Sequence, residues 1–380
     1  MTGKPTPMLK PFISEGPVFN VGVLGCGEVA QVAHIPNLQL ANHMYNVVAV
    51  CDISLEAAQH CGEKFHVKEV YTDYKELLAS PTKIDLVFVL TNDAFHCTHI
   101  TAALRAGKHV FIEKPMAQTL AECDEIAKVS KETGKIVFVG YMRRYAPALL
   151  ELKEILKGHE NDIKYVRVRD IIGNNMYFTQ NSGMYQRYFT PPNDPSIAEA
   201  LVRNFKENLP ELEPSKYNIA SLSLLGSLAS HDLSAMRDLI GMPKRILAAA
   251  RAPDDGSPRP VWWTVLFDYG TFRAFYEMSI DAVPIFDAQI EVHTGDKRIK
   301  VQYDTPYVKG LPITLTTLSS PKGLGDLDTS VYRPTHEDTY TIELRVLYDA
   351  LTKGTPFKTT PEDAKQDVEL NLAIMRALKE

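Results

Sequence analysis

Short apolar segments alternate with helical segments through the first 145 residues, and this alternation constrains the fold more than any other feature. Buried strands are predicted at "FNVGVLGCG", "YNVVAVCD", "IDLVFVLT", "HVFIEK" and "KIVFVGY". Between them the sequence predicts helices from Val29 to Ala41, Ser54 to Phe65, Phe95 to Ala106, and Thr119 to Gly134. Strands that alternate with helices form a parallel sheet covered on both faces. An α/β domain with a doubly wound parallel sheet is therefore expected over residues 18–145.

The boundaries of these helices have recognisable signals. Ser54 is a good N-cap, and Thr119 with Glu122 forms a T-x-x-E capping box. Gly107 and Gly134 follow predicted helices, where glycine readily adopts the left-handed conformation that ends a helix.

The second half has a different pattern. A strand is predicted from Ile163 to Ile171, and residues 173–220 are irregular enough to hold short elements or an active-site cover. The stretch "SLSLLGSLASHDLSAMRDLIG" predicts one helix, and several strands follow it without helices between them. Two helices, near 336–353 and 361–379, close the chain. We expect residues 146–380 to form an α+β domain with an open, mostly antiparallel sheet, whose last helix packs back on the first domain.

A glycine-rich loop follows the first predicted strand and opens the first predicted helix. Gly25, Gly27 and Ala30 stand in a G-x-G-x-x-A pattern. The first glycine permits a tight turn, the second lets a pyrophosphate approach the backbone, and Ala30 lets helix and strand pack closely. The helix N-terminus attracts the anion. Dinucleotide binding is favoured over a glycine turn in some other α/β protein.

Asp52 ends the second predicted strand, where a carboxylate can bind both hydroxyls of a ribose. The same charge would repel a 2′-phosphate, and no Arg or Lys follows in "DISLEAA". The sequence therefore favours NAD over NADP.

Composition excludes several other classes of protein. The net charge is −6, and no basic cluster is dense enough to follow a phosphate backbone, so no nucleic acid partner is expected. No apolar run is long enough to cross a membrane. The five cysteines include no C-x-x-C pair and are interpreted as reduced thiols of a cytoplasmic protein. Residues 1–17 are rich in Pro and Gly and are expected to form a flexible N-terminal tail.

Several motifs in a fixed order resemble the Gfo/Idh/MocA oxidoreductases, the glucose-fructose oxidoreductase and inositol dehydrogenase family. They are "GVLGCGEVA", "AVCD", "VLTNDAFHCTHITAALRAGKHVFIEKPMA", "VGYMRRYAP" and "SHDLSAMRDL". The tripeptide Glu113-Lys114-Pro115 is the most specific of these marks. The resemblance implies a Rossmann domain followed by an α/β domain whose open sheet carries substrate contacts on one side and often an oligomer interface on the other.

The resemblance also implies roles for individual residues. A cis Lys114–Pro115 bond would turn Lys114 into the cleft, where an ammonium can polarise a substrate oxygen and join a proton relay. Glu113 would steady the strand end or contact the cofactor side. The residues expected to contact the cofactor are Gly25, Cys26, Gly27, Glu28, Val29, Asp52, Thr91, Asn92, His96, Glu113, Lys114 and Pro115.

His231 is the second catalytic candidate. A neutral imidazole can accept the hydroxyl proton as hydride leaves carbon. Relatives of this kind usually have an aspartate four residues earlier, where this chain has Ser227. A serine cannot stabilise an imidazolium as a carboxylate would, so the strength of the base and the substrate class are open questions. Asp232 points about 100° away around the helix and is interpreted either as a substrate contact or as a structural one.

Other polar residues are weaker candidates. Tyr141, Arg143 and Arg144 end the first domain, where an arginine could bind an anionic substrate or fix an interdomain contact. His96 and His99 have H-x-x-H spacing without a third ligand, so no metal site is predicted. Neighbours in a strand face opposite ways, so one of Trp262 and Trp263 is expected in the core and the other on the open sheet face.

The favoured function is a dehydrogenase that uses NAD to oxidise a secondary alcohol of a sugar, cyclitol or related polyol, assembled as a homo-oligomer through the open sheet face. Two alternatives remain at this point. One is a non-catalytic NAD-binding sensor or regulator, and the other is a glycosidase that oxidises its substrate transiently with NAD.

Overall fold

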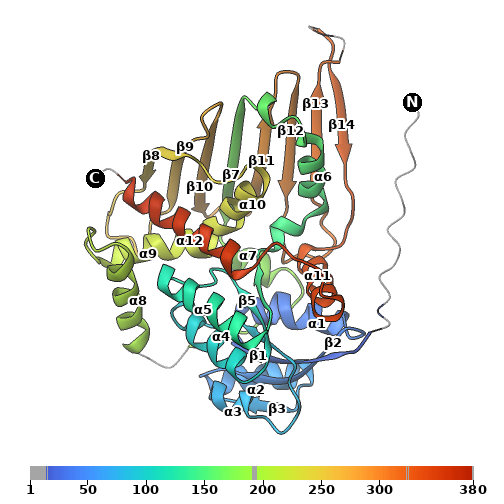
Figure 1. Ribbon diagram of the computed structural model, residues 1–380, viewed down its shortest axis with the longest axis vertical. Helices are drawn as coiled ribbons and strands as arrows, with labels where there is room; N and C mark the ends of the chain where they lie inside the picture. The colour runs from blue at the N-terminus through green and yellow to red at the C-terminus, as the bar shows by residue number, and fades with distance from the viewer. Residues whose placement is uncertain (1–13, 15, 191–194, 322, 324, 379–380) are drawn as a thin grey trace.

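A computed structural model describes residue 14 and residues 16–190, 195–321, 323 and 325–378 of the chain. Two sheets dominate it, one in each half of the sequence (Figure 1). Most of the predicted N-terminal tail lies outside the described residues. Among the described residues, no helix has the length and apolar character needed to span a membrane.

The first sheet has six parallel strands in the order β3-β2-β1-β4-β5-β6, the order that defines the Rossmann fold. The predicted doubly wound sheet is therefore confirmed. Its strands are β1 (Phe19–Leu24), β2 (Tyr45–Cys51), β3 (Glu69–Tyr71), β4 (Leu86–Val89), β5 (His109–Glu113) and β6 (Val137–Gly140).

The connecting helices begin and end largely where their caps predict. Ser54 accepts a hydrogen bond from the Ala57 amide at the start of α2 (Leu55–Phe65). The Thr119–Glu122 capping box opens α5 (Leu120–Thr133), and Gly134 ends it in the left-handed conformation. The remaining elements of this half are α3 (Tyr74–Leu78), the 3-10 turn η2 (Asp93–Phe95) and α4 (His96–Arg105).

The helix predicted from Val29 to Ala41 is not a regular α-helix. It opens with a π turn, η1 (Ala30–His34), and continues as α1 (Ile35–Leu40). A second π turn, η5 (Leu225–Ala229), interrupts the long helix predicted in the second half, between α9 (Lys216–Leu224) and α10 (Ser230–Ile240). π turns occur often at functional sites.

The second sheet has eight strands in the order β14-β13-β12-β11-β7-β10-β9-β8, and only β7 and β10 pair in parallel. The mostly antiparallel sheet is therefore confirmed. Its strands are β7 (Tyr165–Gly173), β8 (Arg245–Arg251), β9 (Trp262–Asp268), β10 (Arg273–Asp281), β11 (Phe286–His293), β12 (Lys297–Tyr303), β13 (Thr314–Ser319) and β14 (Asp328–Tyr332).

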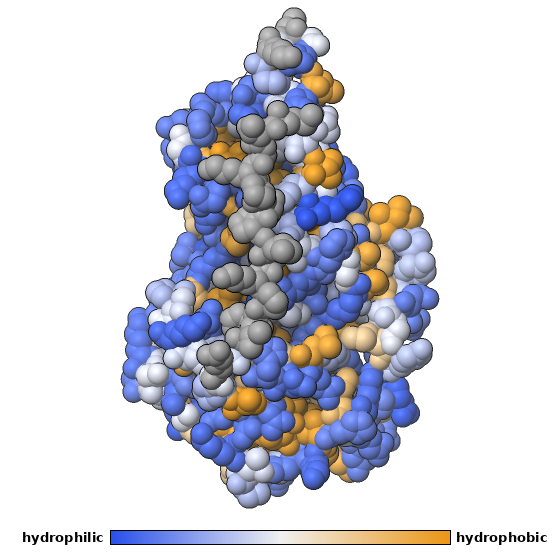
Figure 2. All heavy atoms as spheres, turned by 90° about the vertical axis from the view of Figure 1, so that its right-hand side faces the viewer, coloured by the Kyte–Doolittle hydropathy of each residue, from blue (hydrophilic) through white to orange (hydrophobic). Residues whose placement is uncertain are grey.

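Helices cover one face of this sheet. They are α6 (Pro147–Leu156), α10 and α12 (Pro361–Arg376), which contact strands across its width (Figure 1). Trp263 is fully buried on the covered face, whereas Trp262 is 37% exposed on the other, as the alternation of a strand predicts. Figure 2 views the molecule from the β14 side, where the surface is mainly hydrophilic with scattered apolar groups.

The two halves share an extensive boundary. Helix α12 packs against α5 and β6 of the first sheet, and α11 (Thr339–Lys353) packs against α1 and the 3-10 turn η3 (Met142–Tyr145). The predicted domain division near residue 145 remains a prediction. The segment 173–220 holds the short elements expected there, α7 (Asn175–Gln180), α8 (Pro195–Asn208) and most of α9.

Candidate active site

The glycine loop between β1 and η1 has two glycines with different constraints. Gly25 has φ +99°, and a Cβ built there would lie 2.3 Å from the Leu90 carbonyl oxygen, so the fold itself requires glycine. A Cβ on Gly27 would meet no atom within 4 Å. The backbone of Gly27 therefore faces open space at the start of a helix, which fits a bound pyrophosphate.

Asp52 lies beside this loop at the end of β2. Its Oδ2 accepts a hydrogen bond from the Cys26 amide at 2.8 Å, and its Oδ1 accepts one from the Ser54 amide at 2.9 Å. None of the ion pairs among the described residues includes Asp52, so its charge is not offset by a cation. The carboxylate has the place and the charge to bind the hydroxyls of a ribose.

Other predicted cofactor contacts cluster around the ends of β4 and β5. The two ring nitrogens of His96 lie 2.7 Å from the Pro115 carbonyl oxygen and 3.0 Å from that of Thr91. His96 therefore links the two strand ends. Asn92 caps η2 by accepting a hydrogen bond from the Ala94 amide.

The first helix of the glycine loop also meets a distant segment. The Glu28 carboxylate accepts a hydrogen bond from Tyr188 Oη at 2.7 Å. The Gln31 amide pairs with both backbone groups of Arg187, at 2.9 and 3.0 Å. Sequence patterns did not point to these contacts, because they join residues more than 150 positions apart.

Glu113 ends β5 and is buried. Its Oε1 lies 2.7 Å from Nε2 of His34, and its Oε2 accepts a hydrogen bond from the Lys114 amide at 3.1 Å. Burial pushes the pKa of Glu113 upward, but the hydrogen bond and charge of His34 and the charge of Lys114 outweigh it and hold the pKa below its ordinary value. His34 is a site residue that the sequence reasoning missed.

Lys114 follows Glu113, and its bond to Pro115 is cis, as the resemblance implies. Its ammonium donates a hydrogen bond to the backbone carbonyl of Ser227, in the π turn η5. Burial lowers the pKa of Lys114, although the negative charges of Glu113 and Asp93 oppose that shift. An ammonium with a lowered pKa can give up a proton more readily than an ordinary lysine.

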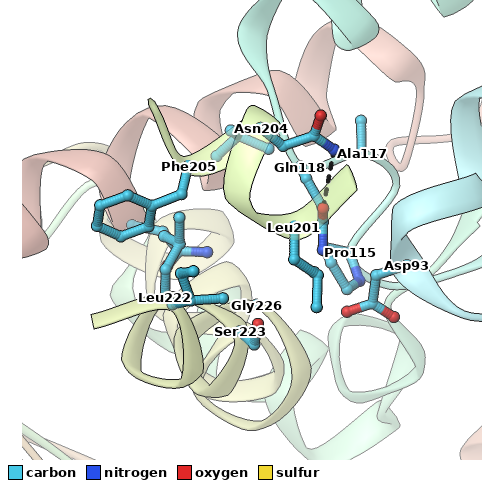
Figure 3. A pocket seen from close by; sticks show the side chains of 13 residues that line it. Asp93, Pro115, Ala117, Gln118, Leu201, Asn204, Phe205, Leu222, Ser223 and Gly226 are labelled. Atoms are coloured by element: carbon cyan, nitrogen blue, oxygen red, sulfur yellow. Dashed lines mark hydrogen bonds between the residues drawn. The ribbon is translucent and has the colours of Figure 1, made fainter. Parts of the chain in front are cut away.

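The π turn is packed tightly against the Glu-Lys-Pro segment. A Cβ on Gly226 would lie 3.1 Å from Pro115 Cγ, so a glycine allows this approach. Figure 3 shows Pro115, Asp93, Leu201, Ser223 and Gly226 around the narrow pocket between this segment and helices α8 and α9. The dashed line in that view joins the Asn204 amide to Gln118 at 2.9 Å.

His231 lies just beyond the π turn, near Lys114. Its Nδ1 is buried and has no hydrogen-bond partner among the described residues. Burial, and then the positive charges of Lys114 and Arg143, lower the pKa of His231 well below its ordinary value. A neutral imidazole beside an ammonium can accept a proton from a bound alcohol.

Asp232, next in the sequence, turns to the interior instead. With Asp170 it flanks the buried guanidinium of Arg143, whose Nη1 lies 3.4 Å from Asp170 and forms a shorter contact with Asp232. Burial raises the pKa of Asp232 well above its ordinary value, with Arg143 opposing and Asp170 adding to the shift. Arg143 joins the end of the first sheet to β7 and α10.

Arg144 and Tyr141 are also buried. Arg144 pairs with Asp363, which in turn pairs with Arg237 at 2.8 Å. Tyr141 is 1% exposed and lies under Arg144, with 5.8 Å between its ring and the guanidinium carbon. The structure thus brings Lys114, Ser227 and His231 together and places Tyr141 and Arg144 in an ion-paired interior. A substrate contact for these two remains a prediction.

No group of three His, Cys, Asp or Glu side chains suited to hold a metal ion occurs in the described part of the chain. His99, the partner of His96 in the H-x-x-H spacing, contacts Thr91 at 2.9 Å, and burial lowers its pKa to about 4.

The Rossmann sheet, the open glycine loop and the strand-end carboxylate are typical of nicotinamide-binding domains, and Lys114 at the end of β5 lies near His231 of α10. The comparisons with known proteins agree. The sequence model of the oxidoreductase family GFO_IDH_MocA, NAD-binding Rossmann fold, matches residues 19–141. The first domain of the chain thus matches the NAD-binding domain of this family, in agreement with the resemblance.

Curated relatives match over the same domain. Inositol 2-dehydrogenase of Salmonella typhimurium is 33% identical over 141 residues, 37% of this chain and 41% of that protein. Inositol 2-dehydrogenase/D-chiro-inositol 3-dehydrogenase of Lacticaseibacillus casei is 40% identical over 141 residues, 37% of this chain and 40% of that protein. The match thus spans about two fifths of the length of these relatives.

Solved structures match over nearly the whole chain. The putative oxidoreductase yvaA of Bacillus subtilis has a TM-score of 0.71 at 20% identity, with 95% of this chain and 97% of that chain covered. The 3-ketoreductase KijD10 of Actinomadura kijaniata, in complex with NADP and TDP-benzene, has a TM-score of 0.73 at 17% identity, with 96% and 98% covered. At these identities the likeness shows that the two-domain fold is shared.

Proposed function

We propose that this protein is an NAD-dependent oxidoreductase that transfers a hydride between a secondary alcohol of an uncharged sugar, cyclitol or related polyol and the nicotinamide. The observation that carries the proposal is the Lys114 ammonium just beyond the end of β5 with the His231 imidazole of α10 near it. An ammonium and a neutral imidazole converge there, next to a loop suited to a dinucleotide.

In the direction of oxidation, the bound nicotinamide supplies the acceptor for the hydride that leaves the carbinol carbon. His231 takes the hydroxyl proton, because its lowered pKa keeps the imidazole neutral. Lys114 donates a hydrogen bond to the substrate oxygen and stabilises the negative charge that develops there. In the reverse direction His231 returns the proton to the carbonyl oxygen while Lys114 polarises that carbonyl.

The preference for NAD rests on Asp52. Its carboxylate is fixed by two backbone amides beside the glycine loop and would repel a 2′-phosphate. The complex of KijD10 with NADP makes a direct comparison of the two cofactors the decisive test for this chain.

The preference for an uncharged substrate rests on the arginines. Arg143 is enclosed by Asp170 and Asp232, and Arg144 by Asp363 and Asp238, so neither guanidinium offers free positive charge to an anion. The curated relatives that act on inositols have uncharged substrates, which supports the same class.

We also propose a homo-oligomer that associates through the uncovered face of the eight-stranded sheet. That face carries Trp262 and the arginines Arg167 and Arg169, residue types enriched at interfaces, and the arginines are paired with Glu277 and Asp287. Light scattering on Trp262→Asp beside the wild type would test it, and unchanged mass would exclude this face.

The test of function is NADH formation with a panel of cyclitols, aldoses and polyols, with NAD and NADP in parallel. Lys114→Ala is expected to bind NAD as the wild type does and to lose about two to four orders of magnitude in turnover. Lys108→Ala, at the opposite end of β5, is the matched control and should remain active. Equal activity of Lys114→Ala would exclude the assignment. NAD binding without turnover would support a sensor, and cleavage of aryl glycosides without net NADH would support a glycosidase.

A further inference from the structure

His34 is a buried residue whose position the proposed chemistry does not explain. It ends the π turn η1, seven positions after Gly27, and its ring is 2% exposed. The rings of Phe88, Phe111 and Tyr340 surround it edge-on, with centroids 5.0 to 5.6 Å away. This cage fixes the plane of the imidazole and leaves its Nε2 facing the Glu113 carboxylate.

The Glu113 carboxylate is divided between two partners. One oxygen meets His34 at 2.7 Å, and the other accepts the backbone amide of Lys114 at 3.1 Å. The Lys114 ammonium is directed away from Glu113 to the Ser227 carbonyl. Glu113 therefore holds the backbone of Lys114 rather than its head group, and His34 holds Glu113.

We propose that His34 is a positioning residue for Lys114, acting through Glu113. The π turn that carries His34 starts within three residues of the phosphate-binding glycine, so one short segment connects the dinucleotide loop to the catalytic lysine. The inference rests on the proposed function in taking Lys114 as the group that meets substrate.

The pair also sets the electrostatic surroundings of Lys114. The charged and titratable groups that act on Lys114 are Glu113, Asp93, Arg143 and Asp170, with His231 beyond them. Those that act on Glu113 are His34, Lys114, Tyr307, Tyr340 and Glu343. Glu343 is fully buried without a hydrogen bond to either oxygen among the described residues, and burial raises its pKa well above the ordinary value, which favours the neutral acid. Removal of His34 would therefore change the pKa of Glu113, which is an ionised partner of Lys114.

The test measures Lys114 without any substrate. Reductive methylation by formaldehyde and cyanoborohydride modifies the unprotonated amine, and mass spectrometry reads the rate at Lys114, with Lys108 as internal reference. His34→Phe removes the hydrogen bond and raises the pKa of Glu113. To the extent that Glu113 takes up a proton, it no longer stabilises the ammonium and the pKa of Lys114 falls, so methylation at pH 8 should accelerate by up to about tenfold, because one pKa unit is a tenfold change.

Companion variants keep the test decisive. His34→Gln, whose amide can still donate near the Nε2 position, should remain close to the wild-type rate. Glu113→Gln should accelerate methylation as His34→Phe does, and the double variant should show no further gain, because both act on one group. An unchanged rate in Glu113→Gln, or fully additive effects, would overturn the proposal even if His34→Phe folds poorly.

A second readout separates this inference from the proposed function. Where turnover is detected, His34→Phe should lower kcat by about tenfold to a hundredfold without weakening NAD binding. A wild type without NAD binding or turnover would refute the proposed function, whereas the methylation rates would still decide the role of His34.

Discussion

Lys114 donates its ammonium hydrogen bond to the backbone carbonyl of Ser227, and not to a side chain. This contact joins the loop after β5 to the π turn η5 and holds the two halves of the molecule together at the candidate site. An ammonium has three N–H donors, so Lys114 can keep this hydrogen bond and donate another to a substrate oxygen. The Ser227 contact thus directs the side chain before substrate arrives. At position 227, where the family pattern has an aspartate, this chain has a serine whose backbone carbonyl accepts the hydrogen bond of Lys114.

The two glycines of the loop should respond differently to alanine. Gly25→Ala should cost about 1 to 3 kcal/mol or more of folding free energy, because its φ is +99° and its Cβ would strike Leu90. Gly27→Ala should change stability by less than about 0.5 kcal/mol, since nothing opposes its Cβ, but should weaken NAD binding at least about tenfold. Urea unfolding measures the change in stability of each variant, and NAD titration measures the change in its affinity for NAD. Undiminished NAD affinity in Gly27→Ala would place the phosphates elsewhere.

Asp52→Asn should narrow the preference for NAD over NADP. The amide oxygen can keep one backbone hydrogen bond, while the charge that repels a 2′-phosphate is removed. We expect the dissociation constant of NADP divided by that of NAD to fall by about tenfold. Glu56→Gln, an exposed carboxylate in the first turn of α2, is the control and should leave the ratio as it is.

Tyr188→Phe should speed the release of NAD by about threefold to tenfold. The tyrosine hydroxyl donates to Glu28 and ties the segment around Arg187 to the glycine loop, and a hydrogen bond to a charged group is among the stronger ones. Stopped-flow fluorescence measures the release rate. Tyr185→Phe is the matched control, because Tyr185 is 85% exposed. Equal rates in both variants would show that this segment does not restrain the cofactor.

Glu343→Gln should stabilise the protein by an amount that grows with pH. Burial raises the pKa of Glu343 in the folded state well above 4.5, so the unfolded chain loses this proton at a lower pH than the folded one. Unfolding of the wild type therefore releases a proton above pH 4.5. Its free energy of unfolding falls by up to about 1.4 kcal/mol per pH unit until the folded pKa of Glu343 is reached.

Urea unfolding from pH 5 to pH 8 tests this. The difference in free energy of unfolding between Glu343→Gln and wild type should rise with pH, whereas exposed Glu151→Gln should follow the wild type throughout. A constant difference for Glu343→Gln would show that this carboxyl group is ionised in the folded protein.

The local features of the fold could be predicted because their causes are local. The Ser54 cap, the Thr119–Glu122 box and Gly134 each involve residues within a few positions of one another. The short elements β3 and α3 were not predicted, since three to five residues show too little periodicity to distinguish a strand or a helix from a loop.

The site could be predicted only in part. The residues of the Glu113-Lys114-Pro115 motif are consecutive in sequence, and so are those of the glycine loop. Resemblance to the family patterns was enough to locate each motif. The pairing of His34 with Glu113 spans 79 positions, and that of Arg143 with Asp232 spans 89, so only the tertiary fold brings them together. The π turns were not predicted for another reason: their residues fit the pattern of a regular α-helix equally well.

The π turn η5 has a consequence for chains of slightly different length. A π turn holds one residue more than an α-helical turn would. Deletion of a single residue between Leu225 and Ala229 would restore regular α-helical spacing. Because the π turn already accommodates the extra residue within one turn, His231 and Asp232 beyond it would keep the directions they face now. The backbone around Ser227, whose carbonyl accepts the Lys114 ammonium, would change instead. One codon in this turn therefore alters the partner of the lysine and leaves the imidazole and the carboxylate in place.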